Sequence, residues 1–155
     1  MEGLNFRFST SEDEILYHNS LLNSPEDCEK EDERGWNEDF IERNTWRVTL
    51  TATLGTRVVG FLKMIGGSST GFSYLQTVYI FPQYRKRGIG RELVKYAEDY
   101  MKRTWNGVGV ELFTLDNKPM DTLIESEHWI KDGVALKRYF RNGRFIPETR
   151  WIKLY

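Results

Sequence analysis

The sequence predicts one α/β (α+β) domain over residues 1–155, with a mixed, mostly antiparallel sheet of six to seven strands and about four helices. Two observations predict this class. Segments that alternate with period two flank a segment with helical periodicity, and an Asn-Gly pair near the C-terminus indicates a hairpin. No internal repeat, low-complexity tract or linker divides the chain, and its length is enough to bury a core without a disulfide.

The N-terminal segment is expected to form a strand and two helices. Residues 4–8 alternate as a short strand, and Ser9-Thr10-Ser11 can cap a helix whose apolar residues continue to Leu22. A second helix is expected over residues 35–44. These elements precede the main run of strands.

Three strands are expected next. The run WRVTLTATL (46–54) alternates with period two, Gly55-Thr56 turns, and 58–65 alternates again, which predicts a hairpin. A Gly/Ser-rich stretch, 66–71, is expected to be a loop. Residues 72–81 form the next predicted strand, which Pro82 ends.

The periodicity then becomes helical. Apolar residues between Ile89 and Met101 fall on one face of a helix expected to end near Arg103. Alternation from 107 to 115 predicts another strand, and Pro119 can occupy the first turn of a helix that continues to Glu127.

The last segment is expected to be a hairpin, because both residues of Asn142-Gly143 tolerate the positive φ of a two-residue turn. Counting outward from this turn predicts one aromatic and one oppositely charged cross-strand pair: Phe140 with Phe145, and Lys137 with Glu148. Pro147 has no backbone donor, so its strand should be an edge strand or carry a bulge.

Charge is unevenly distributed although the net charge is only −1. Residues 11–42 hold twelve acidic residues against Lys30 and Arg34, a net −10, which leaves +9 on the remainder. Such a segment is either a solvated face or an electrostatic attractant for a cationic partner, and both interpretations stay open.

The composition is that of an ordinary globular protein, with 39% hydrophobic and 29% charged residues. The single cysteine, Cys28, cannot form an internal disulfide and lies among acids that disfavour a thiolate. No apolar run is long enough to cross a membrane, and the N-terminus lacks the features of a signal peptide. We therefore expect a cytoplasmic protein without a membrane partner.

The stretch PQYRKRGIGREL (82–93) has the chemistry of an anion site. It places four cations and two glycines between a strand and a helix, where unpaired helix amides and the helix dipole attract phosphate groups. It is neither a Walker A loop nor a dinucleotide fingerprint, because it lacks the Gly-Lys-Ser/Thr of the first and the third glycine of the second.

The longer run LQTVYIFPQYRKRGIG (75–90) resembles the acetyl-CoA motif of the GNAT N-acetyltransferase superfamily, Arg/Gln-x-x-Gly-x-Gly/Ala. The order of expected elements is also similar to that family's. Residues 133–145 resemble the terminal hairpin of polyamine and ribosomal-protein acetyltransferases. The resemblance therefore covers nearly the whole chain and implies a GNAT fold.

The resemblance implies which residues hold acetyl-CoA as co-substrate. The loop and the first helical amides would hold its pyrophosphate, the strand before them would pair with its pantetheine arm, and Asn117, a helix cap on its other interpretation, matches a position that often touches the cofactor. The implied cofactor-binding residues are Val78, Tyr79, Ile80, Arg85, Lys86, Arg87, Gly88, Ile89, Gly90, Arg91 and Asn117. No metal is implied.

The catalytic residues are not assigned by the sequence. Alignment from Asn117 places the family's general-acid tyrosine at Ile124 and its Gly-Phe at His128-Trp129. Tyr74 and Tyr79 are candidate substitutes for the acid. Glu111 is a candidate base, although strand alternation favours an ordinary exposed residue there, and His128 is interpreted as a helix-end residue.

The predicted function is direct acetyl transfer from acetyl-CoA to a primary amine of a cationic acceptor: a polyamine, an aminoglycoside-like compound or a basic peptide. The alternatives are a protein N-terminal or lysine acetyltransferase, and a GNAT module that binds CoA without catalysis. Nucleic acid is not an expected partner, because the cations concentrate at one helix start. The resemblance leaves a homodimer open.

Overall fold

The fold is a single seven-stranded sheet with helices on both faces. The computed structural model describes residues 1–22, 46–66, 70–105, 107–115 and 117–155. The strands lie in the order β1-β2-β3-β4-β5-β7-β6, and every neighbouring pair is antiparallel except β4 and β5. The predicted mixed, mostly antiparallel α+β architecture is confirmed.

The elements follow the predicted order. The strands are β1 (Leu4–Phe8), β2 (Trp46–Leu54), β3 (Arg57–Gly66), β4 (Phe72–Ile80), β5 (Gly109–Leu115), β6 (Ile130–Arg141) and β7 (Arg144–Leu154). The helices are α1 (Ser11–Leu22), α3 (Ile89–Thr104), α4 (Lys118–Ser126) and the short 3₁₀ turn η2 (Pro82–Tyr84). The expected helix over 35–44 lies outside the described residues.

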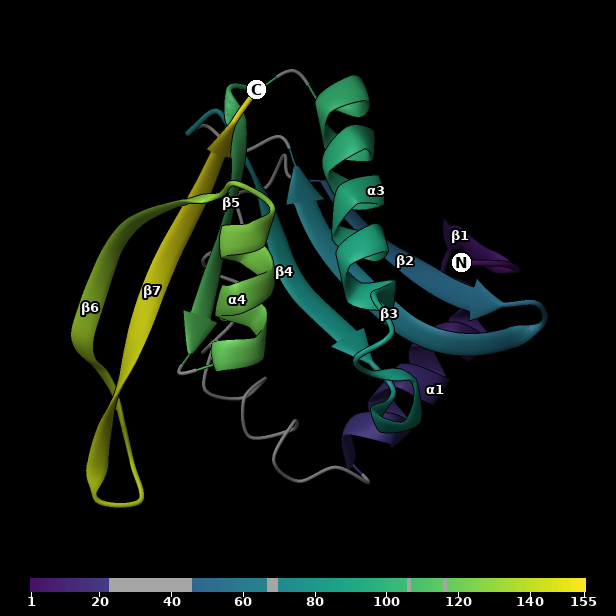
Figure 1. The fold of residues 1–155 in the computed structure, drawn as a ribbon, viewed down its shortest axis with the longest axis horizontal. Coiled ribbons are helices and arrows are strands. Elements are labelled where there is room, and N and C mark those ends of the chain that lie inside the picture. The colour runs from purple at the N-terminus through teal and green to yellow at the C-terminus, as the bar shows by residue number, and fades with distance from the viewer. Residues whose placement is uncertain (23–45, 67–69, 106, 116) are drawn as a thin grey trace.

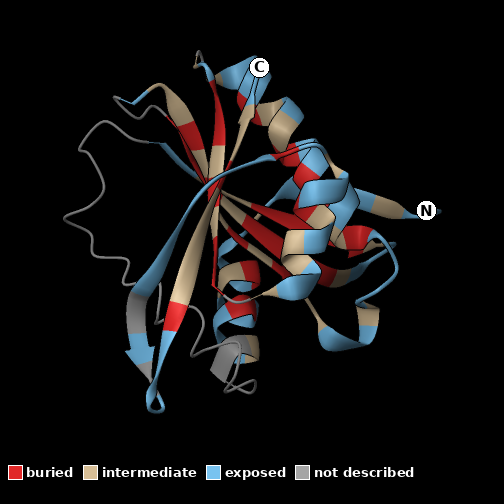
Figure 2. Cartoon of the chain, turned by 60° about the vertical axis from the view of Figure 1, so that its left-hand side comes forward, coloured by how far each residue is buried: buried red, intermediate tan, exposed pale blue. Residues whose placement is uncertain are grey.

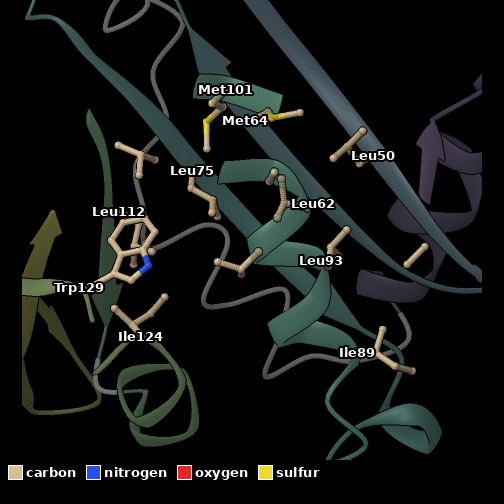
Figure 3. Packing of buried hydrophobic residues seen from close by; sticks show 14 of the residues in the cluster. Leu50, Leu62, Met64, Leu75, Ile89, Leu93, Met101, Leu112, Ile124 and Trp129 are labelled. Atoms are coloured by element: carbon tan, nitrogen blue, oxygen red, sulfur yellow. The ribbon is translucent and has the colours of Figure 1, made fainter. Parts of the chain in front are cut away.

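The layers are visible in Figure 1, in which α3 and α4 lie on one face of the sheet and α1 lies on the other. The principal core forms beneath α3, whose apolar positions Leu93, Val94 and Ala97 are fully buried against the sheet. Figure 3 shows Ile124 and Trp129 closing this core at the β5 side. Burial is concentrated along the central strands and the inward face of α3 (Figure 2).

Helix α1 begins with a reciprocal cap. The Asp13 amide donates to Thr10 Oγ1 (3.3 Å) and the Thr10 amide donates to the Asp13 carboxylate (2.8 Å), so two unpaired helix donors are satisfied. Arg7 of β1 also donates to this carboxylate (Nη2 to Oδ1, 3.1 Å), and that hydrogen bond holds the pKa of Asp13 down at about 2. The predicted cap is confirmed.

The C-terminal hairpin confirms one predicted pair and corrects the other. Phe140 lies opposite Phe145, with their ring centroids 5.1 Å apart. Glu148, however, lies opposite Ala135 and not opposite Lys137. The register between β6 and β7 shifts between Ala135 and Tyr139, opposite Pro147, which marks a bulge. A proline cannot donate to the ladder, so the bulge falls where the donor is missing. The strand that carries Pro147 is internal, and β6 forms the edge of the sheet.

The described residues contain no helix that is both long and apolar enough to span a membrane. They also contain no group of three or more His, Cys, Asp or Glu side chains arranged to hold a metal ion.

Candidate active site

Strands β4 and β5 pair over three residues only and then part. The parallel register joins Phe72 to Gly109, Ser73 to Val110 and Tyr74 to Glu111, and no further rung follows. The register between β3 and β4 shifts between Leu75 and Thr77, which marks a bulge just beyond the last rung. Figure 1 shows the two strands diverging from this point toward the start of α3.

Because the two strands diverge, backbone groups of β4 beyond the last rung point toward β5 without pairing with it. The Phe81 amide donates to the Val59 carbonyl of β3 (3.0 Å), and backbone groups alternate between the two edges of a strand. Those of Val78 and Ile80 therefore face the edge that β5 has left. The Ile80 carbonyl accepts a hydrogen bond from Arg85 Nε (2.7 Å). Within the described residues, no backbone hydrogen bond engages the Ile80 amide or either backbone group of Val78.

The loop between η2 and α3 presents amides without a side-chain cap. Lys86 and Gly88 adopt left-handed φ values of 61° and 84°, which turn the chain back on itself before α3. Gly88 is the N-cap residue and supplies no side chain to the first amides of the helix. The amides from Ile89 to Arg91 therefore carry the positive end of the helix dipole without a capping side chain.

Gly90 is not required by the fold. Its φ is not in the left-handed region, and a Cβ built there would lie 3.7 Å from Ile80 Cγ1 and from Leu123 Cδ1, an ordinary contact distance. An alanine would also favour the helix. A small residue at this position agrees with the family motif, which admits glycine or alanine here.

The cationic side chains of the loop and the helix start differ in their contacts. Arg85 is held by the Ile80 carbonyl and lies over the Tyr79 ring (5.5 Å), so it braces the loop. Arg87 is exposed and lies over the Tyr84 ring (5.6 Å), and Lys86 is also exposed. Arg91 pairs with Glu127 at the end of α4 (3.0 Å).

Asn117 is the N-cap of α4. Its side chain accepts a hydrogen bond from the Met120 amide (3.3 Å), which is the helix-cap interpretation left open by the sequence. The end of the same helix carries a Schellman motif, with Trp129 N–H donating to Ile124 C=O and His128 N–H donating to Glu125 C=O. His128 has φ 65° in this motif, at the position where the family pattern has glycine.

Ile124 cannot act on a substrate in this arrangement. Its side chain is fully buried and belongs to the principal core with Trp129, which packs beside it in Figure 3. It also has no titratable group. The position at which the resemblance would place the family's general-acid tyrosine is therefore part of the core.

The two candidate tyrosines differ in environment. Tyr79 is 6% exposed and packs with Tyr17, Phe61 and Phe81 beneath α1. Tyr74 stands on the last β4–β5 rung, half-buried, with its ring 5.8 Å from that of Phe113. Tyr74 is therefore the tyrosine that lies where the strands part.

Glu111 is not an ordinary exposed strand residue. Its Oε2 atom accepts hydrogen bonds from Nε and Nη2 of Arg150 on β7 (2.9 and 2.7 Å), and its side chain is 18% exposed. Arg150 Nη1 also donates to Asp132 of β6. Burial lowers the pKa of the Arg150 guanidinium, but its contacts with the two carboxylates more than offset this and raise the pKa.

Residues 14–125 match the sequence profile of the family described as "Acetyltransferase (GNAT) family". The chain belongs to the GNAT acetyltransferase family. This membership confirms the enzyme class predicted from the sequence, an N-acetyltransferase of the acyltransferase type. No curated protein sequence matches the chain.

Solved structures share the GNAT fold over most of the chain. A Salmonella typhimurium acetyltransferase that modifies the N-terminal serine of ribosomal protein L7/L12 is 11% identical, with TM-score 0.75 and coverage of 100% of this chain and 96% of that one. Vibrio cholerae spermidine N-acetyltransferase, in complex with CoA and spermine, is 19% identical, with TM-score 0.73 and coverage of 98% and 95%. A putative Bacillus anthracis streptothricin acetyltransferase bound to acetyl coenzyme A is 18% identical, with TM-score 0.64 and coverage of 76% and 68%.

In this GNAT protein the loop residues and the open edge of β4 lie together, as their adjacency in sequence suggests. Arg150 and Asp132 were not predicted. Arg150 lies 39 residues from Glu111, and no local pattern indicates that β7 inserts between β5 and β6. From the sequence alone, only the general rule that a partly buried carboxylate has a cationic partner indicates such a residue.

Proposed function

We propose that the protein transfers the acetyl group of acetyl-CoA directly to a primary amine. The observation that carries this proposal is the open edge of β4 beside the uncapped start of α3. The amides from Ile89 to Arg91, with Lys86 and Arg87 beside them, suit a pyrophosphate. The free backbone groups of Val78 and Ile80 suit an amide-containing arm that pairs as a strand would.

Acetyl-CoA would supply an acetyl group activated as a thioester. The acceptor must arrive as, or become, a neutral amine: a new C–N bond forms, the C–S bond breaks, and one proton is released overall. A lysine-like ammonium has a pKa near 10.4, so freeing its lone pair at pH 7 costs about 4.6 kcal/mol. In this proposal Tyr74, which stands on the rung where the strands part, would donate a proton to the departing sulfur.

The acceptor class in this proposal is a cationic amine, such as a polyamine or the amine of a basic peptide. The acidic segment 11–42 motivates it, and most of that segment lies outside the described residues. Of its described acids, Asp13 pairs with Arg7 and Glu14 lies 3.8 Å from Lys63. These two acids are neutralised within the fold, so attraction of the acceptor would depend on the others.

The test is CoA release from acetyl-CoA in the presence of spermidine, an aminoglycoside, a lysine peptide and a peptide with a free N-terminal serine. We expect release with at least one of these amines and a KM for that amine that rises with salt, because exposed charges are screened. A salt-independent KM would contradict the electrostatic part of the proposal. CoA binding without release in any reaction would contradict catalysis and support a silent CoA-binding module.

A further inference from the structure

One charged cluster lies on the sheet face opposite α3, where β4, β5 and β7 meet. Val110 and Leu112 are buried in the core under α3, so alternation along β5 directs Glu111 to the other face. Tyr74 and Phe113 share this face, since their rings contact each other across the strands. The cluster therefore stands beside the point where β4 and β5 part.

The cluster holds more negative charge than its own cation neutralises. Two carboxylates, from Glu111 and Asp132, face the single guanidinium of Arg150, which leaves one net negative charge. A structural ion pair needs one carboxylate. The Asp132 side chain is 38% exposed and that of Glu111 only 18%, so further compensation of charge is most favourable at Glu111. An external cation with one charge would complete the balance.

One carboxylate oxygen of Glu111, the Oε1 atom, is available to bind this cation. Both hydrogen bonds from Arg150 reach Oε2, and no group among the described residues donates to Oε1. Arg150 is itself fixed from the other side, by Asp132 and by contact with the Phe72 ring at 5.5 Å. The orientation of the Arg150 guanidinium is therefore fixed, and the guanidinium in turn holds the Glu111 carboxylate, with its Oε1 atom, in place.

Two aromatic side chains lie on the same sheet face as this carboxylate. The Tyr74 and Phe113 rings lie 5.8 Å apart at an angle of 41°, and Tyr74 shares a rung with Glu111. Aromatic faces attract ammonium groups electrostatically when these approach within about 6 Å of the ring centre. A carboxylate that shares a sheet face with two aromatic rings has the chemistry of an ammonium site.

We propose that Glu111 binds the ammonium group of the acceptor before transfer, on the sheet face that it shares with the Tyr74 and Phe113 rings, and that Arg150 is the positioning residue that aims its carboxylate. This inference rests on the proposed function, which supplies the acceptor. It names the acceptor class as an amine that presents a single ammonium group to this site. Further charges of a polyamine or peptide would be bound outside it.

The direct test is binding of n-butylammonium to the protein saturated with CoA, followed by the amide NMR signals of β4 and β5. We expect saturable shifts at residues 74, 111 and 113. Glu111→Gln should raise the Kd of n-butylammonium by about tenfold or more, because a hydrogen bond between two charged groups is lost. Shifts elsewhere only, or an unchanged Kd in Glu111→Gln, would overturn the proposal.

Glu98→Gln is the matched control. Glu98 also pairs with a β7 cation, Lys153 (2.8 Å), but does so from α3 on the opposite face of the sheet. Its substitution should leave the Kd of n-butylammonium unchanged. A loss of binding equal to that of Glu111→Gln would indicate a general effect of broken ion pairs and would overturn the assignment.

The positioning role of Arg150 is tested at constant net charge. The double variant Arg150→Met/Asp132→Asn keeps one negative charge, on Glu111, but removes the groups that orient it. We expect weaker n-butylammonium binding with the site still anionic, and partial recovery in Arg150→Lys. Wild-type affinity in the folded double variant would overturn the role of Arg150.

The same experiments separate this inference from the proposed function. If wild-type protein binds n-butylammonium at residues 74, 111 and 113 but releases no CoA with any amine, the proposed function fails and the ammonium site stands. If CoA is released and Glu111→Gln leaves the KM of the amine unchanged, the proposed function stands and the ammonium site fails.

Discussion

Tyr74 and Glu111 occupy the same rung, the last one that joins β4 to β5 before the strands part. This rung stands at the inner end of the opening, at the opposite end from the glycine loop (Figure 1). It places a phenol and a carboxylate side by side where the family pattern would have relied on a tyrosine from α4. Chemistry in this chain is therefore expected to depend on the sheet and not on α4.

The first prediction concerns the phenol. Tyr74→Phe should lower kcat about 10²-fold or more, because it removes the proposed donor to the leaving sulfur while keeping the ring. Tyr79→Phe is the control, since Tyr79 is buried beneath α1 with other aromatic residues. Steady-state rates of CoA release compare the two variants. Equal rates in Tyr74→Phe and wild type would exclude the Tyr74 hydroxyl as the acid.

The second prediction concerns Gly90. Gly90→Asp should raise the Kd of CoA about tenfold or more, or at least ~1.4 kcal/mol, because a carboxylate at the helix start would repel the pyrophosphate. Gly90→Ala should bind CoA as wild type does, since the family motif admits alanine at this position, and its stability should be unchanged or higher by up to about 1 kcal/mol, because alanine favours a helix.

Gly143→Ala supplies the contrasting control. Gly143 has φ 76° at the hairpin turn, with no atom within 4 Å of an added Cβ. The substitution should cost about 1 kcal/mol of stability without changing CoA affinity. Calorimetry and urea unfolding measure both quantities. A Gly90→Asp protein that binds CoA as wild type does would contradict the assignment of the loop.

The third prediction uses the strained residue at the end of α4. His128→Gly should stabilise the protein by about 1 kcal/mol, since His128 holds φ 65° where glycine has no steric penalty. For a chain of this size the melting temperature should rise by about 2–4 °C. His128→Ala keeps the strain and should bring no gain. A lower melting temperature in His128→Gly would mean that the imidazole makes a stabilising contact.

The fourth prediction follows from Asp13, whose pKa is lowered from 3.8 to about 2 by its hydrogen bond with Arg7 and its cap at α1. A depressed carboxyl pKa stabilises the fold above the unfolded pKa, and this contribution disappears as the pH falls from about 4 to about 2. Asp13→Asn should therefore lose about 1–2 kcal/mol at pH 7.

The pH dependence checks the cause of that loss. Urea unfolding of both proteins should give free energies that converge as the pH falls from about 4 to about 2, because the wild-type carboxyl becomes protonated first in the unfolded and then in the folded state. A difference that stays constant from pH 7 to pH 2 would mean that the charge on Asp13 is not what stabilises α1.

Local patterns were sufficient for most of the fold. The Asn142-Gly143 turn determines the Phe140–Phe145 pair because its two residues fix the register nearby. The same counting failed for Lys137, because the register shifts opposite Pro147. The proline allowed for a bulge there, but it does not determine how many residues the facing strand inserts. Register errors of this kind grow with distance from the turn.

The candidate site was predictable only where it is continuous in sequence. Residues 82–93 carry both the glycines and the cations, so the loop could be recognised directly. The partner of Glu111 could not be recognised from the sequence, because Arg150 is brought to Glu111 only by the pairing of β7 with β5. The parting of β4 from β5 is likewise a relationship between distant segments, which periodicity alone does not contain.

The most direct test of the account is calorimetric titration of the protein with CoA and, separately, with pantetheine. If the loop from Arg85 to Arg91 binds the pyrophosphate, CoA should bind and pantetheine, which has the arm but no phosphate, should bind at least about 100-fold more weakly, a difference of ~2.7 kcal/mol. Equal affinities for the two ligands, or no binding of CoA, would contradict the central claim.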